Sequence, residues 1–271
     1  MDQTKIVLLG TGTPNAHPER SGPAIAIIVG ETPYLVDFGP GVIRRAKAAS
    51  IDPINIKTAF LTHLHSDHTI GYPDLIFTSW VLGRNQPLEV YGPAGLKHLT
   101  DHILEAYKED IRERIEGLEP ITQKGIEIRA HEINSGLFFS NSQIKVEAFL
   151  VNHGSWIAYG YKFHTPDKTI VISGDTAPSK ELEKHAKGCD ILIHEIYSVK
   201  GLQKRPEEWQ IYHKQVHTSS HELAELASRA KPELLILYHQ LFWGVSEHQL
   251  LEEIREKYDG KVVSGNDLDI F

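Results

Sequence analysis

The chain has 271 residues, of which 41% are hydrophobic and 24% are charged. This balance is typical of a globular protein and excludes a disordered chain. The formal net charge of −8 provides no field that would attract nucleic acid to the whole surface. The longest basic cluster is weak and consists of Lys200, Lys204 and Arg205.

No apolar run approaches the roughly 20 residues that cross a bilayer, and the amino terminus lacks the basic and apolar segments of a secretion signal. The single cysteine, Cys189, cannot form an internal disulfide, which fits a reducing compartment. Its neighbours in CDILIH are mostly apolar, so we expect a buried and unreactive thiol. These features predict a cytoplasmic protein that binds no membrane.

Short runs of β-branched and other apolar residues recur along the chain and predict strands. They cover 5–9, 24–29, 34–38, 58–62, 88–92, 144–151, 157–163, 169–173, 190–195 and 234–239. Apolar spacing and turn signals predict helices over 41–49, 94–117, 220–230 and 247–258, the last two starting at capping boxes. This order predicts an α/β fold with two packed sheets and outer helices. No linker or composition shift divides it, so we expect a single domain over residues 1–271.

The segment THLHSDH (62–68) places three histidines and an aspartate directly after a predicted strand. Residues two apart in an extended segment point to the same side, so His63 and His65 can bind one cation together. The chain must then turn, which lets Asp67 and His68 reach a second position. Imidazole and carboxylate are ligands for zinc, manganese or iron, so the spacing predicts a metal site.

Three further ligand candidates directly follow apolar runs, namely His153, Asp175 and His239. Taken alone, each would more often be a turn residue or a packed histidine. Strand ends, however, commonly position site residues, and here the three follow the histidine motif as a series. They predict the remaining ligands of the same site.

These motifs resemble those of the metallo-β-lactamase superfamily, over nearly the whole chain from LGTGTP (9–14) to the last strand. The resemblance rests on THLHSDH, VNHGSW, SGDT and LYHQ. SGDT, with HEIYS (194–198) and VHTSSHE (216–222), is most similar to the branch that contains ribonuclease Z, phosphodiesterases and arylsulfatases. The implied fold is an αββα sandwich of two mixed β-sheets with outer helices.

The resemblance also implies two divalent metal ions per chain, with zinc expected and manganese or iron as alternatives. By position, the first ion would be held by His63, His65 and His153, the second by Asp67, His68 and His239, and Asp175 would bridge both. An aspartate rather than a cysteine at the bridging position argues against a true β-lactamase.

Two such ions lower the pKa of a shared water and stabilise the attacking and leaving oxygens. We therefore expect a hydrolase that uses a metal-bridging hydroxide to cleave phosphodiesters or aryl esters, including sulfate esters. Asp67 would also orient the water. His217 matches the family's histidine that is not a ligand, and it would protonate the leaving oxygen while Glu195 fixes its tautomer.

Other polar residues near the motifs are expected to support the site or to have no part in it. Asp37, in the turn DFGPG, is expected to support the metal loop. His194 is expected to be packed rather than catalytic. His213, His221 and His248 are expected on helix surfaces or in loops.

Two departures from ribonuclease Z bear on the substrate. The long arm that grips tRNA is absent, because only 21 residues separate His153 from Asp175. The residues after His239 are Gln-Leu-Phe-Trp rather than a basic contact for RNA, so Phe242 and Trp243 would either pack in the core or line a pocket for an apolar group. A small-molecule ester is therefore favoured over RNA.

Three alternatives remain open at this stage. They are tRNA 3′ processing, lactone hydrolysis, and a non-catalytic scaffold that retains the metal ligands. Related enzymes are often dimers, and the apolar face of 94–117 would suit a homodimer as well as an ordinary core.

Overall fold

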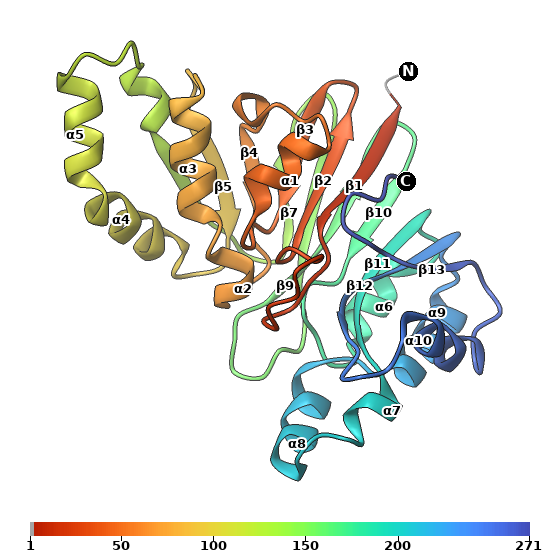
Figure 1. The fold of residues 1–271 in the computed structure, drawn as a ribbon. Coiled ribbons are helices and arrows are strands. Elements are labelled where there is room, and N and C mark those ends of the chain that lie inside the picture. The colour runs from red at the N-terminus through yellow and green to blue at the C-terminus, as the bar shows by residue number, and fades with distance from the viewer. Residues whose placement is uncertain (1–2) are drawn as a thin grey trace. The chain divides into compact units, whose positions relative to one another are not determined.

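The computed structural model describes residues 3–271 (Figure 1). The chain forms two compact units, one built from 4–10, 14–133 and 267–271 and the other from residue 3, 11–13 and 134–266. Each unit contains one β-sheet with its own helices.

The first unit contains a six-stranded sheet in the order β1-β2-β3-β4-β5-β6. Its strands are β1 (Thr4–Gly10), β2 (Ala24–Val29), β3 (Thr32–Val36), β4 (Thr58–Phe60), β5 (Leu88–Gly92) and β6 (Ile128–Glu132). The first three strands pair antiparallel and β3 to β6 pair parallel. Its helices are α1 (Val42–Ala48), η1 (Pro53–Asn55), α2 (Ser66–Thr69), α3 (Tyr72–Val81), α4 (Leu96–Ala106), α5 (Lys108–Glu116) and η2 (Gln123–Ile126).

The core of this unit lies between the sheet and helices α1 and α3 (Figure 1). Val7, Leu35 and Ala59 of the sheet pack with Val42 of α1 and Leu75 of α3, and all five are buried. The same strands end beside the loops that contain the predicted ligands, so the packed sheet is the support for those loops.

The second unit contains a seven-stranded sheet in the order β13-β12-β11-β10-β9-β8-β7. Its strands are β7 (Gly136–Ser140), β8 (Lys145–Leu150), β9 (Tyr159–His164), β10 (Thr169–Ile172), β11 (Ile191–Tyr197), β12 (Leu234–Leu241) and β13 (Val262–Ser264). Strands β10 to β13 pair parallel and β7 to β10 pair antiparallel. Its helices are α6 (Lys180–Ala186), α7 (Val199–Leu202), α8 (Glu207–Val216), α9 (Ser220–Ala230) and α10 (Glu247–Arg255).

The core of this unit lies between the sheet and helices α6, α9 and α10, whereas α7 and α8 lie beyond one end of the strands (Figure 1). Leu192 and Leu235 of the sheet pack with Leu182, Leu223 and Leu250 of the three helices. Cys189 belongs to this core and is 1% exposed, which confirms that its thiol is buried.

Most expected elements are present, with several differences. The expected helix over 94–117 is two helices, α4 and α5, because the backbone at Tyr107 (φ −105°, ψ 14°) leaves the helical region. Both sequence segments are amphipathic, but α5 has no buried residue. The last helix ends at Arg255 rather than 258, and strands β6, β7 and β13 had not been expected.

Among residues 3–271, no helix combines the length and the apolar composition that a bilayer span requires.

Candidate metal centre

The motif THLHSDH lies where β4 ends and runs directly into the short helix α2. His63 is fully buried, and its Nε2 is 3.0 Å from Nδ1 of His65. Asp67 Oδ2 lies 3.6 Å from His68 Nε2, and the rings of His63 and His68 have centroids 4.2 Å apart. The first unit thus gathers all four predicted donors of the motif in one cluster.

Asp37 supports this cluster through hydrogen bonds to Thr62 and His68. Its Oδ1 accepts from the Thr62 backbone N–H at 2.8 Å, and its Oδ2 accepts from the Thr62 hydroxyl at 2.9 Å. The same Oδ2 lies 2.8 Å from His68 Nδ1, so His68 keeps its proton there and directs Nε2 to the donor cluster. Asp37 has φ +58°, a left-handed backbone, and is 1% exposed. The expected support of the metal loop by Asp37 therefore has a geometric basis.

The backbone behind the motif is packed too closely for a side chain at Gly39. A Cβ atom there would lie 2.5 Å from the Asp67 carbonyl oxygen. Gly71 is equally restricted, since its Cβ would lie 2.3 Å from the Gly39 carbonyl oxygen. These two glycines let the turn after β3 and the start of α3 clamp the loop that contains Asp67.

The second unit gathers its own donors from three different strands or the loops that follow them. Asp175 follows β10, and its Oδ2 is 3.6 Å from His239 Nε2 and 4.0 Å from His153 Nε2. His153 follows β8 and donates from Nδ1 to the Val216 carbonyl oxygen at 2.8 Å. Each of the three side chains is at most 2% exposed. His217 offers a further ring nitrogen within 4.8 Å of Asp175 and His239 donor atoms.

His239 reaches this cluster through a β-bulge in β12. Glu195 of β11 pairs with Tyr238 and Ile196 with Gln240, which leaves His239 as the extra residue. Its backbone is left-handed, with φ +45°, a conformation unusual for a residue that is not glycine. The bulge turns the His239 side chain away from the regular alternation of the strand.

Glu195 and His217 lie together, as the sequence suggested. Glu195 Oε1 is 3.3 Å from His217 Nδ1 and also accepts from the backbone N–H groups of Thr218 at 2.9 Å and Thr176 at 3.2 Å. Glu195 is fully buried and His217 is 6% exposed. The hydrogen bonds from Thr218 and Thr176 thus fix this carboxylate beside the Nδ1 edge of the His217 ring.

The loop that contains His217 is held in turn by the buried carboxylate of Glu253 in α10. Glu253 Oε1 accepts from the Ser198 hydroxyl at 2.8 Å, and Oε2 accepts from the Ser220 hydroxyl at 2.5 Å. The backbone N–H groups of Val199 and Lys200 donate to the same carboxylate at 2.9 and 3.1 Å. Glu253 was not singled out from the sequence, because nothing in a helical pattern distinguishes it from a solvated glutamate.

The four histidines that were not expected to take part in the chemistry differ in their burial. His194 is fully buried, as expected, and burial lowers its pKa to about 4. His213 is also buried, against the expectation of a surface position, because α8 turns it toward the rings of Trp243 (4.5 Å) and His217 (5.4 Å). His248 is exposed, as expected, and His221 is half-buried with Nε2 3.1 Å from Glu256.

The aromatic residues after His239 pack within the second unit. Phe242 packs against the core of this unit, and Trp243 packs with Tyr197, whose ring centroid is 5.9 Å away. The core alternative therefore holds for Phe242, while Trp243 also contacts His213. Trp156, in the loop after His153, is 43% exposed.

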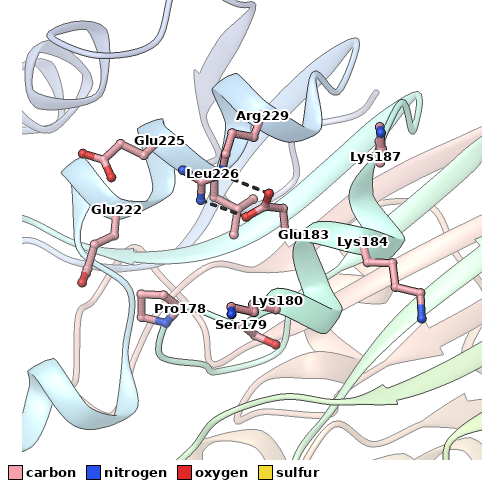
Figure 2. Close-up of a pocket in the computed structure, with 10 residues that line it drawn as sticks. All are labelled: Pro178, Ser179, Lys180, Glu183, Lys184, Lys187, Glu222, Glu225, Leu226 and Arg229. Atoms are coloured by element: carbon pink, nitrogen blue, oxygen red, sulfur yellow. Dashed lines mark hydrogen bonds and ion pairs between the residues drawn. The ribbon is translucent and has the colours of Figure 1, made fainter.

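A surface groove of about 850 Å³ lies between α6 and α9, and none of the predicted site residues lines it (Figure 2). Lys180, Lys184 and Lys187 come from the α6 side and Glu222 and Glu225 from α9. Across the groove, Arg229 and Glu183 form an ion pair at 2.8 Å (Figure 2). These mixed charges give it no preference for anions or cations.

The chemistry of the donors suits divalent metal ions. In each unit, imidazole nitrogens and carboxylate oxygens converge at buried positions, where mutual repulsion and desolvation would otherwise be unfavourable. His68 and His153 each use the ring nitrogen remote from the cluster for an Asp37 or Val216 oxygen, which is the arrangement of metal-binding histidines.

Comparison with known proteins indicates the same family as these residues do. A model of the β-lactamase superfamily domain matches residues 32–240. Ribonuclease Z of Mycobacterium bovis is 30% identical over 270 residues, covering 97% of this chain and 96% of the relative. Ribonuclease Z of Mycobacterium sp. (strain KMS) is 31% identical over 240 residues, covering 88% and 84%.

Solved structures show the same fold. The metallo-β-lactamase fold protein YhfI of Bacillus subtilis superposes with a TM-score of 0.77 at 17% identity and full coverage of both chains. The short form of human tRNase Z superposes with a TM-score of 0.76 at 23% identity, covering 98% of each chain. The expected fold class of two mixed β-sheets with helices is confirmed. The chain belongs to the metallo-β-lactamase superfamily of hydrolases, in its ribonuclease Z and phosphodiesterase branch.

Proposed function

We propose that this hydrolase is a dinuclear metal-dependent phosphodiesterase. The observation that carries the proposal is the pair of donor sets, one in each unit, that contain all seven expected ligands, of which all but the half-buried His65 are buried. Following the family pattern, His63, His65 and His153 would hold one ion, Asp67, His68 and His239 would hold the other, and Asp175 would be shared by both. Zinc is the ion expected from these ligands, and manganese or iron would also suit them.

Two ions, when bound, supply Lewis acidity and a lowered pKa for water. The chain's own groups complete the chemistry. Asp67 accepts a hydrogen bond from the attacking water and orients it toward phosphorus. His217, charged and held at Nδ1 by Glu195, donates a proton from Nε2 to the leaving oxygen. The position of Glu195 Oε1, 3.3 Å from His217 Nδ1, supports this division of roles.

The substrate is proposed to be a small phosphodiester or the 3′ end of an RNA. The relatives named ribonuclease Z favour RNA. The segment between His153 and Asp175 favours a smaller substrate, because β9 and β10 fill it and leave no arm. Aryl sulfates and lactones would place an oxygen on the same ions, and they are the next substrates to test.

Cys189 is a buried free cysteine, and no second cysteine in the sequence could form a disulfide with it. A protein without disulfides fits a reducing compartment, which supports a cytoplasmic location. A homodimer remains a proposal from the family alone, and light scattering of the purified protein measures it.

The decisive experiment pairs metal analysis of the purified protein with hydrolysis assays. The substrates are bis(p-nitrophenyl) phosphate, p-nitrophenyl sulfate, an aryl lactone and a 3′-extended tRNA. About two metals per chain with turnover of the phosphodiester supports the proposal. Turnover of tRNA alone identifies a tRNA-processing enzyme, and turnover of sulfate or lactone alone reassigns the substrate. Metal without any turnover favours a non-catalytic scaffold.

A further inference from the structure

Two exposed histidines lie side by side on α4, outside the donor sets of the metal centre. His98 and His102 are four residues apart, so they follow one another on the same face of the helix. Their ring centroids are 4.0 Å apart. The other histidines with this spacing form pairs that include the buried His217. Within residues 3–271, His98 and His102 are therefore the only such pair with both side chains exposed.

The His102 ring is held in one tautomer by the helix itself. Its Nδ1 lies 2.8 Å from the His98 carbonyl oxygen. A carbonyl oxygen can only accept, so Nδ1 carries the proton and the neutral ring has a lone pair on Nε2. Metal-binding histidines commonly donate from one ring nitrogen to a backbone carbonyl and ligate through the other. His102 thus has the hydrogen bond of a ligand, as His153 has in the buried centre.

The carboxylate of Asp101 borders the pair. Asp101 is exposed and is three residues after His98, a neighbouring position on the helix surface. It forms no ion pair with any other residue that the structure describes, whereas Glu105, on the next turn, is paired with Lys108 at 2.5 Å. Lys97 is exposed at about 100° around the helix from His98. The charge of Asp101 therefore favours a cation over an anion beside the two rings.

The helix that presents the pair is fixed against the first unit. Leu96 and Thr100 are buried, and the Thr100 hydroxyl lies 2.9 Å from the hydroxyl of Tyr72 in α3. The helix starts after Gly95, where an added Cβ would lie 2.7 Å from the side chain of Leu64 in the histidine motif. Because the backbone under both histidines is already ordered, binding of an ion between them requires little further ordering.

We propose that His98 and His102 form a second metal site, which binds a late first-row divalent ion such as Cu²⁺, Ni²⁺ or Zn²⁺. Imidazole is a good ligand for all three ions, and two histidines four apart on a helix can bind one ion together. The site has only two side-chain ligands, so it binds more weakly than the buried donor sets. Because the ligands come from successive turns, the ion also cross-links α4 and stabilises it. This site goes beyond the proposed function, since neither histidine is an expected ligand of the centre.

The first test is chromatography of the untagged protein on a resin that carries Ni²⁺ on iminodiacetate. An immobilised ion reaches only exposed ligands, so the buried donor sets do not contribute to retention. We expect the wild type to be retained until imidazole is added, and His98→Ala and His102→Ala each to lose that retention. His248→Ala is the matched control, because it removes an exposed histidine of α10 and should leave retention unchanged.

A double variant separates the spacing of the histidines from their number. Lys97→His combined with His98→Ala keeps two histidines on the surface of α4 but places them five residues apart, about 140° around the helix. This variant should lose retention as His98→Ala does, and circular dichroism checks that each variant is folded. Retention equal to that of the wild type in either variant would overturn the proposal.

Hydrogen exchange tests whether the ion acts on α4. Addition of Zn²⁺ to the purified wild type should slow exchange of the α4 amides, because an ion that binds only the folded helix stabilises it. The same addition to His98→Ala should leave α4 unchanged. This measurement requires no turnover, so it is independent of whether the protein is a phosphodiesterase. Unchanged exchange of α4 in the wild type, or equal slowing in both proteins, would refute the site.

Discussion

The Nδ1 atom of His68 lies 2.8 Å from Oδ2 of Asp37, although the two residues are 31 positions apart in the chain. The same carboxylate holds Thr62, so one buried aspartate orients the beginning and the end of the histidine motif. Asp37 is not itself one of the proposed metal ligands. Its effect is to select the tautomer in which His68 Nε2 is available as a ligand.

Asp37→Asn is therefore expected to weaken metal binding without unfolding the protein. The amide retains the shape but accepts fewer hydrogen bonds, and loss of such a partner costs about 10- to 100-fold in metal affinity. Competition with a chromophoric chelator measures the change. Asp52→Asn, which alters an exposed helix cap, is the control and should bind metal like the wild type.

Substitutions of a ligand and of the proton donor should separate metal content from turnover. His63→Ala is expected to lose metal and activity together. His217→Ala is expected to keep its metal while kcat falls by about 100- to 10,000-fold, the usual contribution of a general acid. Metal analysis of each variant beside its kinetics is the measurement. An active His63→Ala protein that contains no metal would refute the whole mechanism.

Gly39→Ala is expected to disturb the metal loop through backbone contact alone. The new Cβ would meet the Asp67 carbonyl oxygen at 2.5 Å, so the loop must shift. We expect reduced metal content in a folded protein, seen by metal analysis together with circular dichroism. Gly83→Ala is a useful comparison, since Gly83 has a left-handed backbone but no atom within 4 Å of the added Cβ. Full metal content in Gly39→Ala would show that the loop tolerates the shift.

The buried histidines predict how stability depends on pH. Burial lowers the pKa of His194 from 6.5 in the unfolded chain to about 4 in the folded protein. Between these values the unfolded chain binds more protons, so stability is lost as the pH falls from about 6.5 toward 4. The loss is on the order of 3 kcal/mol for His194. Urea unfolding of the chelator-treated protein at several pH values measures it, and His194→Gln should flatten the dependence.

Cys189 offers a probe of whether the two units unfold as one domain, which we propose. Burial raises its pKa to about 12, so a thiol reagent at pH 8 should react only after the second unit unfolds. Hydrogen exchange reports the first unit under the same conditions. A single urea midpoint for both supports one domain, while thiol labelling at a lower urea concentration than exchange of β1 and β2 would show two independent units.

The sequence was most informative where the polypeptide follows regular rules. The run of histidines after β4 could be assigned because alternation in an extended segment places His63 and His65 side by side, as the 3.0 Å contact shows. The start of α9 could also be predicted, because the capping box at Ser219 is a local sequence signal.

Features that depend on distant contacts could not be found in this way. The bulge at His239 arises from pairing between β11 and β12, and no local pattern announces it. The burial of His213 depends on Trp243 from another segment, so its helical position alone suggested a surface residue. The break at Tyr107 between α4 and α5 was hidden because the apolar spacing continues across it.

The carboxylate of Glu253 also has a consequence for synthesis of the protein. It is 33 residues beyond Ser220 and 55 beyond Ser198, so the anchors of the His217 loop have no acceptor until α10 has been made. A chain that is growing on the ribosome would already contain every proposed ligand and still lack this acceptor. The anchoring of the His217 loop would thus be completed only after α10 has been synthesised and packed.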